Sequence, residues 1–190
     1  MTRVISGEAR GRRLVVPPSG TRPTSDRARE AVFSALQSRL VTFRDLVVLD
    51  LYAGSGALGL EALSRGAKRV DFVESDPQAA VTIQSNIDTV ALTGAHVHRL
   101  SAERWIKART GIPPAQLVFA DPPYAMTNSD LADVLSALSE GGLSVDCLVV
   151  VERPTRGPKF AFPPQITAEW DRPYGEATMW LGRFGSVAPC

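Results

Sequence analysis

Residues 46–59 read LVVLDLYAGSGALG: an apolar run with an acidic residue after it, a glycine-rich loop and the start of a helical pattern. A short, continuous apolar run is typical of a strand that is buried on both faces. The loop has the spacing G-x-G-x-x-G, which allows a tight turn from a strand into a helix. This stretch therefore predicts a strand–loop–helix unit, with the helix near residues 57–65.

The same unit recurs further along the chain. Apolar runs lie at 70–73, 116–120 and 147–151, a weaker one at 95–100, and helices are expected near 76–91 and 128–140. Strands that alternate with such helices form parallel sheets with both faces covered. The last 35 residues, rich in proline and aromatic residues, predict a closing pair of antiparallel strands, one near 176–184. We therefore predict an α/β fold with a doubly wound, mostly parallel sheet.

Four of the apolar runs are followed at once by an acidic residue. These residues are Asp50, Glu74, Asp121 and Glu152. In an open α/β sheet the carboxyl ends of the strands line the ligand crevice. The sequence thus predicts several carboxylates around one site.

The glycine loop alone favours a dinucleotide site, but Asp50 argues against that ligand. This acid lies four positions before the first glycine, where its charge would repel a pyrophosphate. It suits a cation, and S-adenosyl-L-methionine (AdoMet) carries an ammonium and a sulfonium group and no phosphate. Gly54 and Gly56 would let the backbone approach the methionine part of AdoMet. Glu74, after the next strand, is placed to accept hydrogen bonds from both ribose hydroxyls.

The adenine ring needs an apolar slot and a polar partner for its amino group. The segment Ser101-Ala102-Glu103, after the third strand, is the expected source of both. A helix cap is the alternative role of these residues.

Residues 121–124 read Asp-Pro-Pro-Tyr and follow the predicted strand 116–120. The two prolines stiffen the backbone and remove two amide donors. The Asp121 carboxylate and the Pro122 carbonyl can then each accept one hydrogen bond from the NH2 group of a base. Held in this way, the amine aims its lone pair at the sulfonium methyl group, and positioning and electrostatics drive the transfer. Tyr124 offers a ring on which an extruded base stacks; a proline-rich turn with a capping acid is the structural alternative.

The N-terminal part of the chain is basic. Residues 1–44 carry nine arginines against three acidic residues, a net charge of +6, whereas residues 45–190 carry −5. A hairpin followed by an irregular segment is predicted over 1–24, and a helix, capped by Ser25 or Asp26, near 26–40. A basic arm on an acidic body suggests a polyanionic partner, with a solvated basic tail as the alternative.

Length and composition exclude several classes of protein. The 190 residues fit one domain, or one domain with a short extension, and the apolar fraction of 44% is that of an ordinary globular protein. Cys147 and Cys190 cannot form a disulfide framework, and no Cys/His cluster has zinc spacing. No apolar stretch approaches the ~20 residues of a membrane span, and residues 1–13 lack the apolar core of a signal peptide. We therefore expect a soluble cytoplasmic protein with no metal centre and no membrane partner.

Three segments together resemble the class I AdoMet-dependent amino-methyltransferases: residues 50–59, FVESD at 72–76 and DPPY at 121–124. The N-terminal residues are more specific. GEARGRRL at 7–14 and PSGTRPTSDRAREAVF at 18–33 are similar to the RsmD family, and the similarity runs from residue 3 to about 184. Enzymes of that family are bacterial methyltransferases of guanine N2 in 16S ribosomal RNA, at the position conventionally numbered 966.

The resemblance implies a Rossmann-like methyltransferase domain at 41–190 with a seven-stranded sheet, and a basic hairpin and helix at 1–40 that grips RNA. It implies that AdoMet binds at Asp50, Gly54, Gly56 and Glu74, and that the target amine is held at Asp121, Pro122 and Tyr124. Ser101 and Ala102, which we expect beside the adenine ring, depart from the acid-containing segment of the family. The expected RNA contacts are Arg3, Arg10, Arg12, Arg13, Arg22 and Thr24. The expected partner is 16S rRNA in an assembled or partly assembled small subunit.

Other functions stay open on the residues alone. Guanine N2 and adenine N6 are both aryl amines, so a DNA or RNA adenine-N6 methyltransferase is consistent with the same DPPY chemistry. An RNA-binding ribosome-assembly factor with a vestigial methyltransferase core is a further alternative, against which the intact acids argue. An NAD-dependent oxidoreductase is disfavoured by the position of Asp50.

Overall fold

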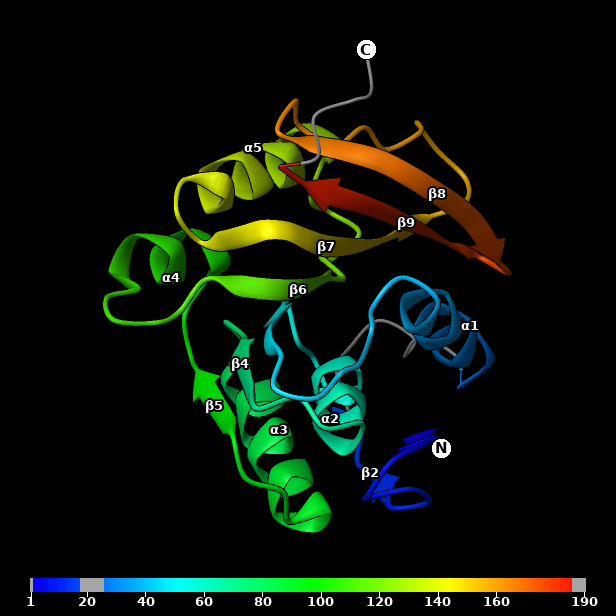
Figure 1. The fold of residues 1–190 in the computed structure, drawn as a ribbon, viewed down its shortest axis with the longest axis vertical. Coiled ribbons are helices and arrows are strands. Elements are labelled where there is room, and N and C mark those ends of the chain that lie inside the picture. The colour runs from blue at the N-terminus through cyan, green and yellow to red at the C-terminus, as the bar shows by residue number, and fades with distance from the viewer. Residues whose placement is uncertain (1, 18–25, 186–190) are drawn as a thin grey trace.

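The computed structural model describes residues 2–17 and 26–185, and its centre is a sheet of seven strands (Figure 1). The strands are β3 (Val47–Leu51), β4 (Arg69–Val73), β5 (Ala95–His98), β6 (Ala115–Ala120), β7 (Leu143–Pro154), β8 (Ile166–Tyr174) and β9 (Ala177–Phe184). They lie in the order β5-β4-β3-β6-β7-β9-β8. The pairs from β5 to β7 are parallel, and β9 is antiparallel to β7 and β8. The predicted doubly wound, mostly parallel sheet is confirmed.

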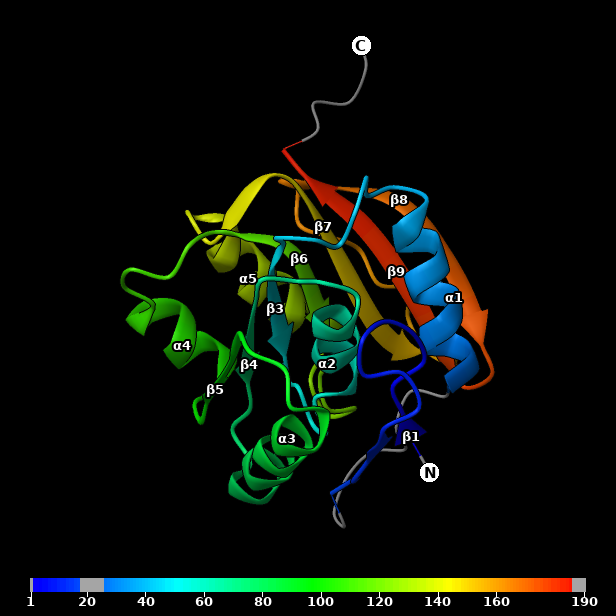
Figure 2. The same ribbon diagram turned by 60° about the horizontal axis from the view of Figure 1, so that its bottom comes forward.

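Helices cover both faces of the sheet (Figure 2). They are α1 (Asp26–Gln37), α2 (Ala57–Ser64), α3 (Pro77–Val90), α4 (Ala102–Ala108) and α5 (Asn128–Ser139). Alternate residues of a strand point to opposite faces. Val48 and Phe119 accordingly belong to the core under α1, α2 and α3, whereas Leu49 and Val118 belong to the core under α4 and α5.

Strand β7 extends beyond the predicted run 147–151 at both ends. The extension reaches Pro154 because β9 pairs with it as far as Pro154 and Ala177. Glu152 therefore lies inside a strand and not directly after one. Asp50 likewise lies inside β3, one residue before its end.

The N-terminal arm, residues 2–14, is docked against helix α2. Its short strands β1 (Thr2–Arg3) and β2 (Arg13–Leu14) pair with each other. The backbone N–H groups of Ile5 and Ser6 donate to the carboxylate of Glu61 at 2.7 and 3.0 Å, and Ala9 N–H donates to Ser64 Oγ at 2.9 Å. Glu61 is fully buried on α2. These bonds fix the conformation of the arm relative to the sheet.

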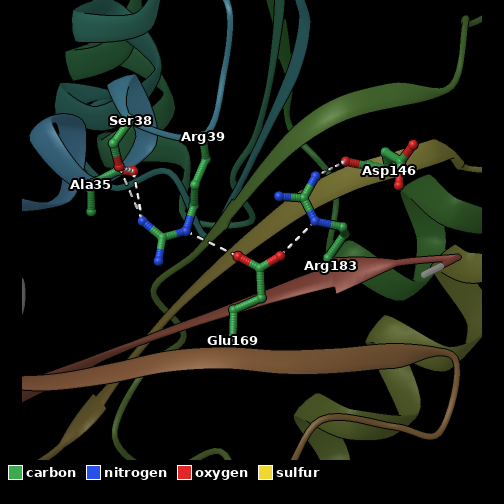
Figure 3. A network of polar contacts seen from close by, with 6 residues as sticks. All are labelled: Ala35, Ser38, Arg39, Asp146, Glu169 and Arg183. Carbon is green, nitrogen blue, oxygen red and sulfur yellow. Dashed lines mark hydrogen bonds and ion pairs between the residues drawn. The ribbon is translucent and has the colours of Figure 1, made fainter. Parts of the chain in front are cut away.

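Helix α1 is held on the sheet by a buried apolar face and, just beyond its C-terminus, by a surface network. The ring of Phe33 packs on Phe119 of β6, with 5.6 Å between centroids. At the surface, Glu169 of β8 bridges Arg39 at 3.0 Å and Arg183 of β9 at 2.5 Å (Figure 3). Because exposed ion pairs contribute only about 0–1 kcal/mol each, we attribute most of the docking energy to the apolar face of α1.

Candidate active site

A cavity of about 510 Å³ opens where strands β3, β4 and β6 end. This is the edge at which the sequence places its acidic residues, and Asp50, Glu74 and Asp121 all line the cavity wall. The strand order reverses between β3 and β6, so the cavity lies at the switch point of the sheet, where open α/β sheets bind ligands.

Glu74 is fixed by two backbone donors. Its Oε2 accepts from Gly54 N at 2.9 Å, and its Oε1 accepts from Asp76 N at 2.8 Å. A carboxylate has about four lone-pair positions. The two bonds leave one position on each oxygen, which matches the two hydroxyls of a ribose.

Asp50 is a buried carboxyl group beneath the N-terminus of α2. Its side chain is almost inaccessible, and Oδ2 accepts from Gly59 N at 2.9 Å. Burial raises the pKa of Asp50 to about 8; the bond from Gly59 opposes this shift and the charge of Glu74 adds to it. A cationic ligand beside Asp50 would favour its charged form.

The glycines of the loop have different roles. Gly54 lines the cavity with a φ of 55°, a backbone conformation that favours glycine, and a Cβ there would lie 3.9 Å from the backbone oxygen of Tyr52. Gly56 has a φ of 75°, and a Cβ there would lie 3.3 Å from both Phe72 and Ile83. Its missing side chain therefore makes room for the protein's own core, whereas the sequence argument assigned that room to the cofactor. Gly59 allows close packing of α2 on β4, because its Cβ would lie 2.4 Å from Phe72.

The segment expected to contact adenine caps a helix and also lines the cavity. Ser101 Oγ caps α4 by accepting from Arg104 N at 3.4 Å. Ser101, Ala102 and Glu103 also line the cavity, at the end farthest from Asp121 in the strand order.

The cavity wall also includes Tyr52 and Arg29, which the sequence motifs did not predict. Tyr52 has a left-handed backbone with a φ of 58°, and its buried hydroxyl has no hydrogen-bond partner among the residues that the structure describes. Arg29 of α1 is fully buried, and its Nη2 donates to Asp26 at 2.6 Å and to the carbonyl of Arg3 at 2.8 Å. The sequence does indicate the burial of Arg29, because this residue lies on the same face of the helix as Val32 and Phe33.

These residues fit AdoMet. The cavity volume lies in the ~300–1,000 Å³ range of small-molecule sites. Glu74 offers acceptors for a ribose, Asp50 a carboxyl group for a cation, and the unpaired hydroxyl of Tyr52 a polar contact on an otherwise apolar stretch of wall. When bound, AdoMet supplies a methyl group on a positively charged sulfur.

The DPPY segment forms the corner of the cavity after β6. Asp121 and Pro123 line the wall, Pro122 is buried behind them, and Tyr124 is 56% exposed outside it. Burial, followed by the charges of Glu152 and Asp50, raises the pKa of Asp121 well above its usual value, and Arg153 opposes this shift. The structure thus brings the predicted target carboxylate into the same cavity as the predicted cofactor carboxylates.

The predicted RNA-binding arginines differ in their surroundings. Arg10 and Arg13 are exposed. Arg3 is also exposed, and its Nε lies 3.8 Å from Oδ2 of Asp26. The guanidinium of Arg12 donates to the last carbonyls of α3, those of Thr89 and Val90. Two further predicted contacts, Arg22 and Thr24, lie outside the described residues.

No group of three or more His, Cys, Asp or Glu side chains within 2–17 and 26–185 is placed to hold a metal ion. Of the helices formed by those residues, none has the length and apolar character that a membrane crossing requires.

The fold and the cavity define the class of the protein. The sheet is Rossmann-like, and the glycine loop, Glu74 and the DPPY corner lie on one cavity. This combination defines an AdoMet-dependent methyltransferase.

Comparison with known proteins gives the family. Residues 2–183 match the family described as Conserved hypothetical protein 95, and the chain belongs to this family, which is the RsmD family that its motifs resemble. The chain is 37% identical over 170 residues to Ribosomal RNA small subunit methyltransferase D of Escherichia coli (strain K12), a match that covers 88% of the chain and 80% of the relative. Family membership excludes the NAD-dependent oxidoreductase.

Solved structures agree with the fold. The putative methyltransferase yhhF from Escherichia coli superposes with a TM-score of 0.81 at 33% identity, covering 98% of this chain and 99% of that one. An RNA methyltransferase from Salinibacter ruber, solved in complex with S-adenosyl-L-homocysteine, superposes with a TM-score of 0.65 over 88% of this chain and 97% of that one. At 16% identity, the second likeness concerns the fold alone.

Proposed function

We propose that the protein transfers a methyl group from AdoMet to the exocyclic N2 of a guanine in 16S ribosomal RNA, at the RsmD-type position 966. The observation that carries the proposal is the position of Asp121, at the corner of the cavity that also holds Asp50 and Glu74. Membership in the RsmD family and the name of the Escherichia coli relative support ribosomal RNA of the small subunit as the substrate.

The chain's own groups divide the chemistry between two ends of the cavity. At one end Glu74 and Asp50 bind and orient the methyl donor. At the other end the Asp121 carboxylate and the Pro122 carbonyl accept the two hydrogens of the target amine, which orients its lone pair. Tyr124 lies outside the cavity wall at the same corner, where an exposed ring is placed to stack on an extruded base. The amine loses its proton after the transfer, so no general base is needed.

The N-terminal extension, residues 1–40, is proposed to grip the RNA. Its arm is docked on α2, and the exposed side chains of Arg3, Arg10 and Arg13 provide cationic contacts for phosphates. Arg12 contributes by tying the arm to the end of α3. Arg22 and Thr24 are proposed as further RNA contacts.

The proposed substrate is the assembled or partly assembled small subunit, and the proposed location is the cytoplasm. The test is incubation with labelled AdoMet and each of three substrates: hypomethylated small subunits, free 16S rRNA and DNA. The modified nucleoside is then identified by mass spectrometry and mapped. We expect N2-methylguanosine at one position of 16S rRNA and no label with an Asp121→Asn control.

Other outcomes would contradict the proposal in distinct ways. N6-methyladenosine in RNA or DNA would favour the adenine-N6 methyltransferase. RNA binding without any label, in a protein that still binds AdoMet, would favour an assembly factor with a vestigial core.

A further inference from the structure

Asp121 has a second carboxylate beside it, that of Glu152. Strands β6 and β7 are parallel, with Ala120 opposite Val151, so the next residues, Asp121 and Glu152, are also neighbours across the two strands. Adjacent strands lie about 4.8 Å apart. Phe119 and Val150, two residues earlier, both face the core under α1, α2 and α3. By the alternation of strand side chains, Asp121 and Glu152 project to this same side.

The two carboxylates share one buried environment. Glu152 is 9% exposed, and its charge is the second-largest cause, after burial, of the raised pKa of Asp121. The next residue, Arg153, projects to the opposite face, where its Nε donates to Asn128 Oδ1 at 2.9 Å and its Nη2 to the Met126 carbonyl at 2.5 Å. Arg153 thus supports the 121–128 segment from the other face of the sheet, whereas Glu152 lies on the same face as Asp121, the residue that lines the cavity wall.

The strand order indicates where the target base lies. If Glu74 and Asp50 hold the donor over β4 and β3, the base lies on the other side of the switch point, over β6 and β7. With its amine at Asp121 and its Watson–Crick edge turned toward β7, such a base would bring the ring position next to the amine to Glu152.

Guanine and adenine differ at that group. On the Watson–Crick edge of guanine, the neighbour of the N2 amine is N1–H, a hydrogen-bond donor. On the same edge of adenine, the neighbour of the N6 amine is N1, a hydrogen-bond acceptor. An ionised carboxylate accepts hydrogen bonds and cannot donate. It pairs with the guanine edge and opposes the lone pair of the adenine edge.

We propose that Glu152 selects guanine, by accepting the N1–H of the target base while Asp121 and the Pro122 carbonyl accept its amine. This inference rests on the proposed function and adds the residue that sets its base specificity. It also supplies a physical distinction between guanine N2 and adenine N6, which the DPPY segment alone does not provide.

The test uses a base that keeps the N2 amine and loses the N1–H. 2,6-Diaminopurine replaces the N1–H of guanine with a lone pair. It is placed at the target position of 16S rRNA by ligation, and the RNA is reconstituted into small subunits. We compare kcat/KM for guanine and 2,6-diaminopurine in the wild type, in Glu152→Gln and in a matched carboxylate-to-amide control, Glu140→Gln, at the far end of α5.

We expect the wild type and Glu140→Gln to prefer guanine by roughly 100-fold or more, because a site built around a substrate N–H rejects the analogue that lacks it. In Glu152→Gln the amide can donate to N1, so the preference falls below about tenfold while the Kd for AdoMet stays unchanged. A loss of structure would lower both rates together and leave their ratio unchanged.

The outcomes separate the two proposals. If the wild type methylates guanine and Glu152→Gln keeps the full preference, the role of Glu152 is wrong and the proposed function stands. If the wild type does not methylate guanine N2, the proposed function itself is wrong.

Discussion

The two ends of the cavity hold their carboxylates differently. At the donor end, the chain's own backbone fixes each acid: two N–H groups bond Glu74, and one bonds Asp50. At the target end, no donor among the described residues bonds the Asp121 carboxylate, and burial with two neighbouring acids raises its pKa. The donor end is therefore preorganised before any ligand binds, whereas we propose that the target end obtains its hydrogen-bond donors from the base.

The largest effect is expected at the target end. In Asp121→Asn the amide NH2 faces the amine of the base, donor against donor, so we expect kcat on small subunits to fall by about 10³-fold. The Kd for AdoMet should stay within about twofold, because Glu74 and Asp50 are unchanged. Single-turnover kinetics and calorimetry measure the two quantities. If Asp121→Asn keeps more than a tenth of the wild-type kcat, Asp121 does not hold the target amine, and the two ends of the cavity do not differ as proposed.

The donor end is expected to respond in the opposite way. In Glu74→Gln the charge and one acceptor are lost, and charge-assisted hydrogen bonds contribute about 1.5–3 kcal/mol. The Kd for AdoMet should rise roughly 10–100-fold, while kcat at saturating AdoMet stays within about threefold. A fall in kcat with an unchanged Kd for AdoMet would show that Glu74 acts in methyl transfer and not in AdoMet binding.

The sequence could predict the donor end better than the target end, for a physical reason. Asp50 and Glu74 follow continuous apolar runs, and the positions of strand ends depend on local pattern. The burial of Pro122 and the pairing of Asp121 with Glu152 depend on the register between β6 and β7, which no local pattern encodes.

The same limit applies to long-range contacts elsewhere. Arg12 meets the end of α3 across 77 residues, and Gly56 faces Phe72 and Ile83 rather than the cavity. In the sequence, Arg12 is one of several arginines of the basic arm, and Gly56 is one of three glycines of the loop. Only their contacts in the folded protein distinguish them from their neighbours.

A third prediction concerns Asp50, whose pKa of about 8 is set mainly by burial. In the free protein it is largely protonated below pH 8, and a bound cation favours the carboxylate, so binding releases a proton. Affinity for AdoMet should therefore rise between pH 6 and 7.5, by at most about tenfold per pH unit. Calorimetry in buffers of different ionisation enthalpy measures the released proton. Asp50→Asn should release none; an equal release from that variant would assign the proton to another group.

The pKa of Asp50 also predicts a dependence of stability on pH. The unfolded carboxyl has the ordinary value of 3.8, so between about pH 4 and 8 the folded state binds a proton that the unfolded state does not. Stability from this group is present at low pH and declines as pH rises through that window. Urea unfolding of wild type and Asp50→Asn across the window measures it, and the difference between them should shrink toward low pH.

The smallest effects are expected in the N-terminal arm. Here too, one residue, Arg12, bonds to the protein itself, whereas another, Arg13, is proposed to bond to the ligand. The guanidinium of Arg12 bonds the carbonyls of α3, whereas the side chain of Arg13 has no hydrogen bond or ion pair within the described part of the chain. Arg12→Ala should lower the free energy of unfolding by about 1 kcal/mol. Arg13→Ala should change it by less than about 0.5 kcal/mol and instead reduce the salt dependence of RNA binding by about one phosphate contact. Urea midpoints and binding isotherms at several salt concentrations measure both, and an exchange of the two phenotypes would show that the arm uses Arg12, not Arg13, for its ligand.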